Sequence, residues 1–305
     1  MQQLLRKPLL AVADSDRMEG LVRRHAHGLV NRFVAGEDLE SAVAAVRGIA
    51  EQGMATTLDQ LGENVSTVQE AESAAETYVT ILERLAAEGL EPNISIKLTM
   101  LGLDLGDEIA NDLLTRVLAA AKDVGGFVRI DMEGSAYTER TIAITVAQHA
   151  VFPGTVGTVI QSYLKRSAAD LERLIAAQIR VRLVKGAYAE PGELAFRDRK
   201  QVDDSYLRLM RRLLDVGVFP ALATHDPAIT DEARHYVRRQ GVRLDQFEFQ
   251  MLYGVRRDAQ EELSQGGYGM RIYVPYGTEW YPYFTRRIAE RPANAVFVLR
   301  QFVGR

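Results

Sequence analysis

The segment Phe127-Val128-Arg129-Ile130-Asp131-Met132-Glu133 sets the pattern of this chain. It predicts a strand, and a helical pattern follows it at 137–150. A second strand candidate, Val156-Gly157-Thr158-Val159-Ile160-Gln161, comes next and is followed by a helical pattern at 167–177. Strands that alternate with helices at this spacing predict βαβ units, in which successive strands lie parallel.

The same alternation runs through the whole chain. The strand candidates are 54–58, 93–99, 127–133, 156–161, 180–185, 219–225, 246–252 and 270–275. The helical patterns are 15–35, 37–52, 66–88, 107–123, 137–150, 167–177, 202–217, 227–239, 255–264 and a last one around 283–290. We therefore predict an α/β fold, a (β/α)8 TIM-type barrel at 53–305 preceded by N-terminal helices at 1–52. An open doubly wound sheet is the alternative, but it usually carries a glycine-rich phosphate turn, and neither G-x-G-x-x-G nor G-x-x-x-x-G-K-[ST] occurs.

The composition excludes several classes of protein. With 305 residues, 47% hydrophobic and 26% charged, the chain has the composition of a globular protein with a large core. A net charge of -4 shows no basic excess, so no nucleic-acid partner is expected. The absence of cysteine excludes disulfides, thiolate metal sites and a cysteine nucleophile. No apolar run is long enough to span a membrane and no secretion signal is evident, so we expect a cytoplasmic protein.

Polar side chains recur at the carboxyl ends of the predicted strands, where barrel enzymes carry their active sites. They are Lys97, Asp131, Glu133, Gln161, Arg182, Lys185, Thr224, His225, Asp226, Gln250, Tyr273 and Tyr276. Most of them are costly to bury without partners, so their recurrence favours a site at the barrel mouth. Arg182 and Lys185 are three residues apart and face opposite sides of a strand, so one is expected to point inward and the other to reach the rim.

Two adjacent arginines stand on the last helical pattern. Tyr283, Arg286, Arg287 and Glu290 are spaced so that a helix places them on one face. Adjacent guanidiniums repel each other and favour an anion between them, because each offers a planar fork to a carboxylate or phosphate. Taken alone, these residues also fit a solvated face with an internal Arg–Glu pair.

Several chemistries fit this set of residues. Asp131 and Glu133 could hold a divalent metal, although the ligand set is thin and we expect no metal. Lys97 or Lys185 could form a Schiff base in a barrel lyase that acts on a small carboxylate. A barrel that binds an anion without catalysis is a further alternative. The chain could instead bind an anionic cofactor together with a carboxylate substrate, through Lys97, Arg182, Lys185, Arg286 and Arg287.

Segments from residue 95 to about residue 300 resemble proline dehydrogenase, a flavin-dependent (β/α)8 enzyme, in its monofunctional form. In order, these segments are 95–99, 129–133, 161–166, 182–188, 223–226, 247–254, 271–275 and 283–290. Tyr188 is followed by Ala189, where long bifunctional relatives commonly carry tryptophan, and the stretch from Tyr273 to Tyr283 is short. Both features match the short type.

The resemblance implies oxidation of L-proline to Δ1-pyrroline-5-carboxylate with reduction of FAD. It implies that the substrate carboxylate is held by Lys97, Arg286 and Arg287. The residues implied to shape the pocket around the ring are Tyr188, Leu252, Tyr273 and Tyr283, and Glu290 is implied to support the Arg pair or to line the pocket. Asp131 is implied to organise the neighbouring Lys and Tyr, Arg182 to lie near flavin N5, and Tyr273 to favour proline over hydroxyproline. The residues implied to contact the flavin are Asp131, Gln161, Arg182, Lys185, Gly186, Ala187, Tyr188, Thr224, His225 and Gln250.

The resemblance also implies partners. A membrane quinone is expected to accept the electrons, which implies a peripheral enzyme at the inner face of the membrane. A separate pyrroline-5-carboxylate dehydrogenase is expected to receive the product, since the chain has no cysteine to serve an aldehyde dehydrogenase domain. The substrate amine must lose a proton before hydride departs, and no side chain in the sequence is an obvious base for it.

Overall fold

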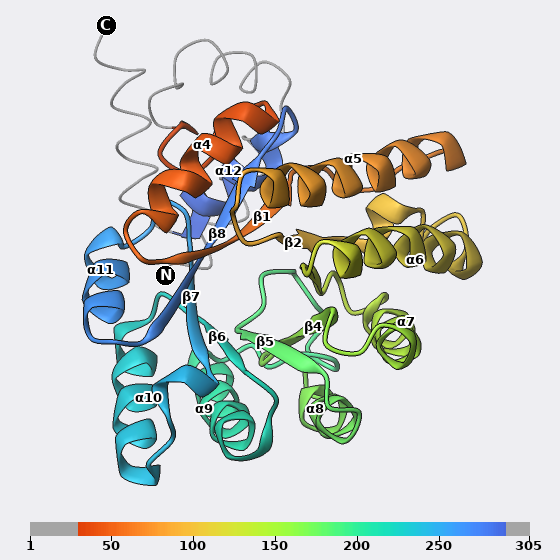
Figure 1. Cartoon of the computed structure of the whole chain (residues 1–305). Coiled ribbons are helices and arrows are strands. Elements are labelled where there is room, and N and C mark those ends of the chain that lie inside the picture. The colour runs from red at the N-terminus through yellow and green to blue at the C-terminus, as the bar shows by residue number, and fades with distance from the viewer. Residues whose placement is uncertain (1–29, 291–305) are drawn as a thin grey trace, which may run out of the picture.

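The computed structural model describes residues 30–290, and side chains as far as Arg287. Eight parallel strands pair in sequential order and close into a barrel, which confirms the predicted fold (Figure 1). The strands are β1 (Ala55–Gln60), β2 (Asn93–Ile96), β3 (Phe127–Ile130), β4 (Val156–Gln161), β5 (Arg180–Val184), β6 (Ala221–Ala223), β7 (Glu248–Leu252) and β8 (Gly269–Tyr276). The helices are α4 (Leu39–Ala50), α5 (Val68–Ala87), α6 (Asp107–Asp123), α7 (Thr138–Val151), α8 (Ser167–Ala176), α9 (Arg199–Val216), α10 (Pro227–Gln240), α11 (Arg257–Gln265) and α12 (Trp280–Glu290).

Several predicted strands extend too far, mostly where polar residues follow them. The predicted strand 93–99 ends at Ile96, and its last residues enter a 3-10 turn, η1 (Leu98–Leu101). The predicted strand 219–225 shrinks to β6, because Phe219 has a positive φ of 41° and Pro220 has no N–H to donate to the ladder. Of the predicted helix 15–35, residues 15–29 lie outside the described range, and the chain turns directly after Val30.

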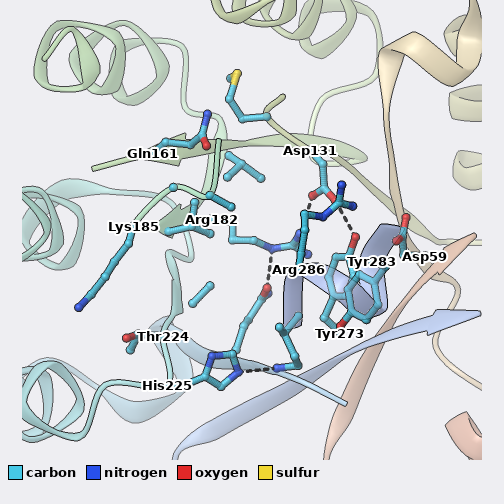
Figure 2. Close-up of a pocket in the computed structure, with 18 of the residues that line it drawn as sticks. Asp59, Asp131, Gln161, Arg182, Lys185, Thr224, His225, Tyr273, Tyr283 and Arg286 are labelled. Atoms are coloured by element: carbon cyan, nitrogen blue, oxygen red, sulfur yellow. Dashed lines mark hydrogen bonds and ion pairs between the residues drawn. The ribbon is translucent and has the colours of Figure 1, made fainter. Parts of the chain in front are cut away.

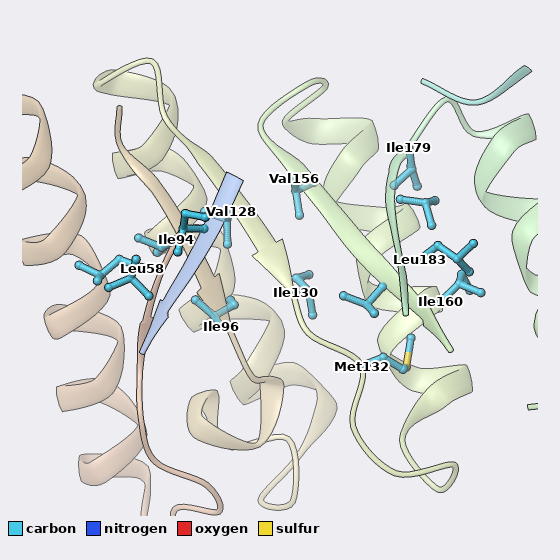
Figure 3. Packing of buried hydrophobic residues seen from close by; sticks show 14 of the residues in the cluster. Leu58, Ile94, Ile96, Val128, Ile130, Met132, Val156, Ile160, Ile179 and Leu183 are labelled. Carbon is cyan, nitrogen blue, oxygen red and sulfur yellow. The ribbon is translucent and has the colours of Figure 1, made fainter. Parts of the chain in front are cut away.

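The two faces of the sheet carry different side chains. Apolar residues at alternate positions pack outward under the helices, as Ile94, Ile96, Val128 and Ile130 do in Figure 3. The intervening positions include buried polar residues, namely Thr57, Ser95, Arg129, Arg182, Glu248, Gln250 and Arg271. Gly157 makes room for one of them, since a Cβ there would lie 2.7 Å from Arg129 Nη1.

Glu248 is an ionised carboxylate that stabilises the buried end of this polar interior. Both of its oxygens accept from Arg271 Nε at 3.0 Å, and Gln250 Nε2 donates to Oε1 at 2.5 Å. Burial raises the pKa of Glu248, but Arg271 outweighs burial and holds the pKa below its ordinary value of 4.5. A pKa that is lower in the folded state contributes stability above pH 4.5, and this stability is lost as the pH falls through the folded value.

We therefore expect the free energy of unfolding to fall with acid more steeply in the wild type than in Glu248→Gln. Urea unfolding of both proteins between about pH 6 and about pH 3 measures the difference. The glutamine variant is the matched comparison, since every other carboxylate titrates in both proteins. Parallel curves would mean that Glu248 has the same pKa in the folded and unfolded chains.

The N-terminal part of the described chain holds α12 in place. Helix α4 packs against β1 and β8. A second apolar cluster, separate from the main core, joins residues before α4 to α12 and contains Val30, Phe33, Val34, Leu61, Trp280, Tyr281, Tyr283 and Phe284. Trp280 Nε1 also donates to Glu37 Oε1 at 2.7 Å. These contacts fix the helix that carries Arg286 and Arg287.

Between residues 30 and 290, no helix has the length and apolar character needed to cross a bilayer.

Candidate active site

A cavity of about 550 Å³ is lined by residues at and beyond the carboxyl ends of the strands (Figure 2). It brings together nearly every residue for which the sequence predicted a role. Those on its wall are Lys97, Asp131, Gln161, Arg182, Lys185, Gly186, Ala187, Tyr188, Thr224, His225, Gln250, Leu252, Tyr273, Tyr283, Arg286 and Arg287. Glu133 and Tyr276, which were also predicted at the barrel mouth, do not line the cavity, and Glu290 has its side chain outside the described part of the chain. The volume falls in the range of about 300–1,000 Å³ that is typical of small-molecule and cofactor sites.

Lys97 is a buried cation at the end of β2. Its Nζ lies 3.2 Å from Asp59 Oδ1 on β1, and the lysine is 8% exposed. Burial alone would lower the pKa of Lys97, but Asp59 and Asp131 together raise it above its ordinary value. The ammonium is therefore charged at neutral pH. A charged ammonium suits the binding of a carboxylate and does not suit a Schiff-base lysine, which must be a free amine.

Helix α12 contributes two further cations to the cavity wall. Arg286 Nη2 lies 2.9 Å from Glu63 Oε1, and both side chains are about one-third exposed, at 30% and 31%. The guanidinium of Arg287 lies over the ring of Tyr283, 5.2 Å from its centroid. All three α12 side chains face the cavity, as their spacing predicted.

Asp131 links two other residues of the cavity wall, Arg182 and Tyr273. Its Oδ1 accepts from Arg182 Nη1 at 2.7 Å, and its Oδ2 accepts from the Tyr273 hydroxyl at 2.8 Å. Arg182 also donates through Nε to Gln250 Oε1 at 2.6 Å and through Nη2 to Ser95 Oγ at 3.0 Å. These bonds tie together side chains from β2, β3, β5, β7 and β8. Arg182 is thus 4% exposed and held by three side-chain acceptors.

Lys185 reaches the rim while Arg182 points inward, as the three-residue spacing predicted. Lys185 Nζ lies 2.5 Å from Asp203 Oδ1 and 2.8 Å from Asp226 Oδ2. Burial raises the pKa of Asp226, but Lys185, the N–H of Ala228 and Arg199 together lower it below the ordinary value. Asp226 also caps α10 by accepting from the N–H of Ala228 at 3.1 Å. The rim is thus an ordered network of charges attached to α9 and α10.

The loop after β5 and the end of β6 complete this side of the cavity. Gly186 has a φ of 110°, and a Cβ there would lie 2.2 Å from the ring of Tyr163, so only glycine fits. His225 Nε2 accepts from the N–H of Leu252 at 3.0 Å, so the neutral imidazole carries its proton on Nδ1.

The cavity therefore has two chemically different sides (Figure 2). One side, formed by the ends of β4 to β7, presents polar groups spread over a long wall, including Gln161, Lys185 and Thr224. The other side, formed by β1 to β3, β8 and α12, presents three cations and two tyrosines, namely Lys97, Arg286, Arg287, Tyr273 and Tyr283. The first suits an extended, partly polar cofactor, and the second suits a small anion with an apolar ring.

The metal alternative finds no support in this geometry. Glu133 is bonded to Thr99, whose N–H and hydroxyl donate to its carboxylate at 3.3 and 2.7 Å. Asp131 is engaged by Arg182 and Tyr273. Over residues 30–290, no three His, Cys, Asp or Glu side chains come together in a way that could hold a metal ion.

Asp59 and Glu63 are cavity residues that sequence reasoning missed. The predicted first strand ended at Leu58, whereas β1 continues to Gln60 and carries Asp59 into the mouth. The available signal was an acidic residue directly after an apolar run, as at Asp131. Glu63 stands in the loop after β1, and only its contact with Arg286 reveals it.

The sequence matches the family model described as proline dehydrogenase over residues 42–300. It is 41% identical to the proline dehydrogenase of Deinococcus radiodurans, with 98% of each chain covered. It is 43% identical to proline dehydrogenase 1 of Bacillus subtilis, with 88% of this chain and 89% of the relative covered.

A solved structure of proline utilization A from Bdellovibrio bacteriovorus, inactivated by N-propargylglycine, has a similar fold. The TM-score is 0.83 at 26% identity, and the match covers 90% of this chain and 34% of that one. This chain thus spans about a third of the length of that protein. The cavity with its two sides, the barrel and the similarity along nearly the whole chain agree, and the chain belongs to the proline dehydrogenase family of FAD-dependent oxidoreductases, which convert proline to Δ1-pyrroline-5-carboxylate.

Proposed function

We propose that Lys97, Arg286 and Arg287 hold the carboxylate of L-proline in this cavity. The supporting observation is that all three cations line the same side of one cavity, with Tyr273 and Tyr283 beside them. The carboxylate is the strong handle on a small apolar ring, so three cations suffice to orient the whole substrate. The tyrosines and Leu252 then enclose the ring and exclude water from it.

FAD fits the opposite wall in this proposal. Gln161, Lys185, Thr224 and His225 supply polar contacts there, and the glycine at 186 lets the loop after β5 pass close to Tyr163. FAD supplies the hydride acceptor when it is bound. Arg182 and Asp131 lie between the two sides, so they fix the orientation of the substrate relative to the cofactor. Tyr273 lines the pocket proposed for the substrate ring, and we propose that it favours proline over hydroxyproline.

A membrane quinone is the proposed electron acceptor, and the enzyme is proposed to work at the inner face of the membrane as a peripheral protein. A separate pyrroline-5-carboxylate dehydrogenase is proposed to consume the product. Both proposals rest on the family resemblance. Anaerobically reduced protein should regain its visible absorption on addition of a short-chain quinone, and it should sediment with vesicles of bacterial lipid. Protein that does neither would contradict the quinone and membrane proposals and leave proline oxidation in place.

The visible spectrum tests the main proposal. The purified protein is expected to be yellow, and L-proline is expected to bleach the flavin band in the absence of oxygen. A colourless protein in which borohydride traps a lysine adduct with substrate would favour the Schiff-base lyase. A protein that binds small carboxylates but reduces no acceptor would favour the non-catalytic barrel.

Lys185→Ala is expected to lose FAD occupancy while keeping its fold. Removal of the ammonium leaves Asp203 and Asp226 facing each other at the cofactor wall, where they would repel an anionic cofactor. The ratio of flavin to protein absorbance measures occupancy, and circular dichroism measures the fold. Lys200→Ala is the matched control, because Lys200 pairs with Asp204 on the exposed face of α9, the helix that carries Asp203. Full occupancy in Lys185→Ala would remove this residue from the cofactor site.

A further inference from the structure

Asp59 has a buried carboxylate oxygen without a partner in the wall of the cavity. The residue is 1% exposed, and Oδ1 lies 3.2 Å from Lys97 Nζ. Oδ2 is buried as well and accepts no hydrogen bond in the described part of the chain, because the nearby Tyr273 hydroxyl gives its proton to Asp131. A buried acceptor left unsatisfied is unfavourable, so it calls for a donor supplied by something that binds there.

The other carboxylates of the cavity are already engaged. Both oxygens of Asp131 accept hydrogen bonds, from Arg182 and from Tyr273. Asp226 is paired with Lys185 and Arg199, and Glu63 is paired with Arg286 near the surface. Asp59 is the most deeply buried of the four, with a side chain 1% exposed against 15–31% for the others. Because the other three carboxylates are engaged, Asp59 is the carboxylate best placed to accept a proton from a ligand.

The position beside Lys97 identifies which part of the ligand meets Asp59. In an α-imino acid, the nitrogen and the carboxylate are bonded to the same carbon. A group next to the cation that holds the carboxylate is therefore within reach of the nitrogen. We infer that Asp59 Oδ2 accepts the N–H of the substrate amine and takes its proton before oxidation. This inference rests on the proposed function and supplies a base that the sequence alone did not reveal.

The step balances as follows. The bound ammonium carries two N–H bonds, and one of its protons moves to Asp59 while the bonding pair stays on nitrogen as a lone pair. When the adjacent ring carbon loses hydride to FAD, this lone pair forms the C=N bond of a protonated imine. Asp59 is left as a neutral acid and returns its proton to water after product release.

The titratable groups around Asp59 come from three neighbouring strands and one helix. The charged ones are Lys97 and Asp131, and the neutral ones are Tyr273, Tyr276 and Tyr78. Burial raises the pKa of Asp59, Lys97 opposes it, and Asp131 adds to it, with a net rise above the ordinary value. A raised pKa makes the carboxylate a better proton acceptor than an exposed aspartate.

Asp59→Asn in the FAD-loaded enzyme tests the inference. Asparagine keeps the size and an oxygen for Lys97, but its amide takes no proton. The rate of anaerobic flavin bleaching by proline is expected to fall by about 100-fold or more, the usual loss when a general base is removed. The affinity for cyclopentanecarboxylate, which has the ring and carboxylate but no nitrogen, is expected to stay close to the wild-type value. Perturbation of the flavin band measures this affinity without turnover.

Each other outcome counts against Asp59. Equal bleaching rates in the wild type and Asp59→Asn would overturn the inference. An equal loss of affinity for proline and cyclopentanecarboxylate would show that Asp59 only positions Lys97, and would also overturn it. If Asp59→Asn does not retain FAD, Asp59→Glu decides: it keeps a carboxylate and must still bleach, and a flavin-loaded but inert Asp59→Glu contradicts the inference. A yellow wild type that proline does not bleach would instead overturn the proposed function, and this inference with it.

Discussion

Arg287→Met is expected to reduce kcat/KM for proline by a factor that corresponds to about 2–5 kcal/mol. Methionine keeps much of the apolar stem but removes the planar fork that we propose receives the carboxylate. Arg286→Met is expected to fall in the same range, and it also leaves Glu63 without its cation beside the incoming anion. Steady-state kinetics with a quinone analogue measure the effect, and it should appear mainly in KM, since the carboxylate is bound equally in the ground and transition states.

Arg212→Met is the matched control for both arginine variants. Arg212 pairs with Glu172 through two hydrogen bonds of 2.8 Å, but this pair is about half-exposed and lies on the outer helices. Loss of an exposed pair is expected to change little. Near-normal kcat/KM in Arg286→Met or Arg287→Met would show that the substrate carboxylate binds elsewhere.

The fold was predictable from the sequence because strand and helix patterns alternate without interruption. Each strand of a closed parallel barrel is covered by helices, so apolar alternation repeats in every unit. Strand ends were less predictable, because the apolar pattern of a strand does not show where its ladder ends, and Lys97 and Asp131 serve contacts across the barrel. Lys97 leaves the ladder to pair with Asp59, and no pattern within residues 93–99 reveals that partner.

The cavity was predictable as a set of residues but its connections were not. The resemblance named Asp131, Arg182 and Gln250 separately, whereas the structure shows that they form one hydrogen-bonded chain. The partners of Arg286 and Lys185 are carboxylates more than fifteen residues away in the chain, so only the closed barrel brings them together. Asp59 was missed because the predicted strand ended at Leu58, one residue before it. Its role depends on a free oxygen, which is a property of the packed site.

Asp131→Asn is expected to lower stability by about 3–5 kcal/mol, the usual cost of removing one partner of a buried ion pair. The side chain of Arg182 is 5% exposed, so its charge would be left in the barrel with only neutral acceptors, Gln250 and Ser95. Urea unfolding of the FAD-loaded protein measures the loss. Activity is expected to fall as well, because Arg182 and Tyr273 both lose their shared anchor.

Asp104→Asn separates this effect from the loss of any aspartate–tyrosine contact. Asp104 accepts from the Tyr137 hydroxyl at 2.9 Å, close to the 2.8 Å of the Tyr273–Asp131 bond, but on the exposed surface. Because water replaces the lost acceptor there, Asp104→Asn is expected to unfold at nearly the wild-type urea concentration. If Asp131→Asn were as stable as Asp104→Asn, the buried Arg182 would have found another counterion, and the chain from Gln250 to Tyr273 would not depend on Asp131. The loss of stability in Asp131→Asn therefore measures how strongly the barrel interior holds the wall against which the substrate is proposed to lie.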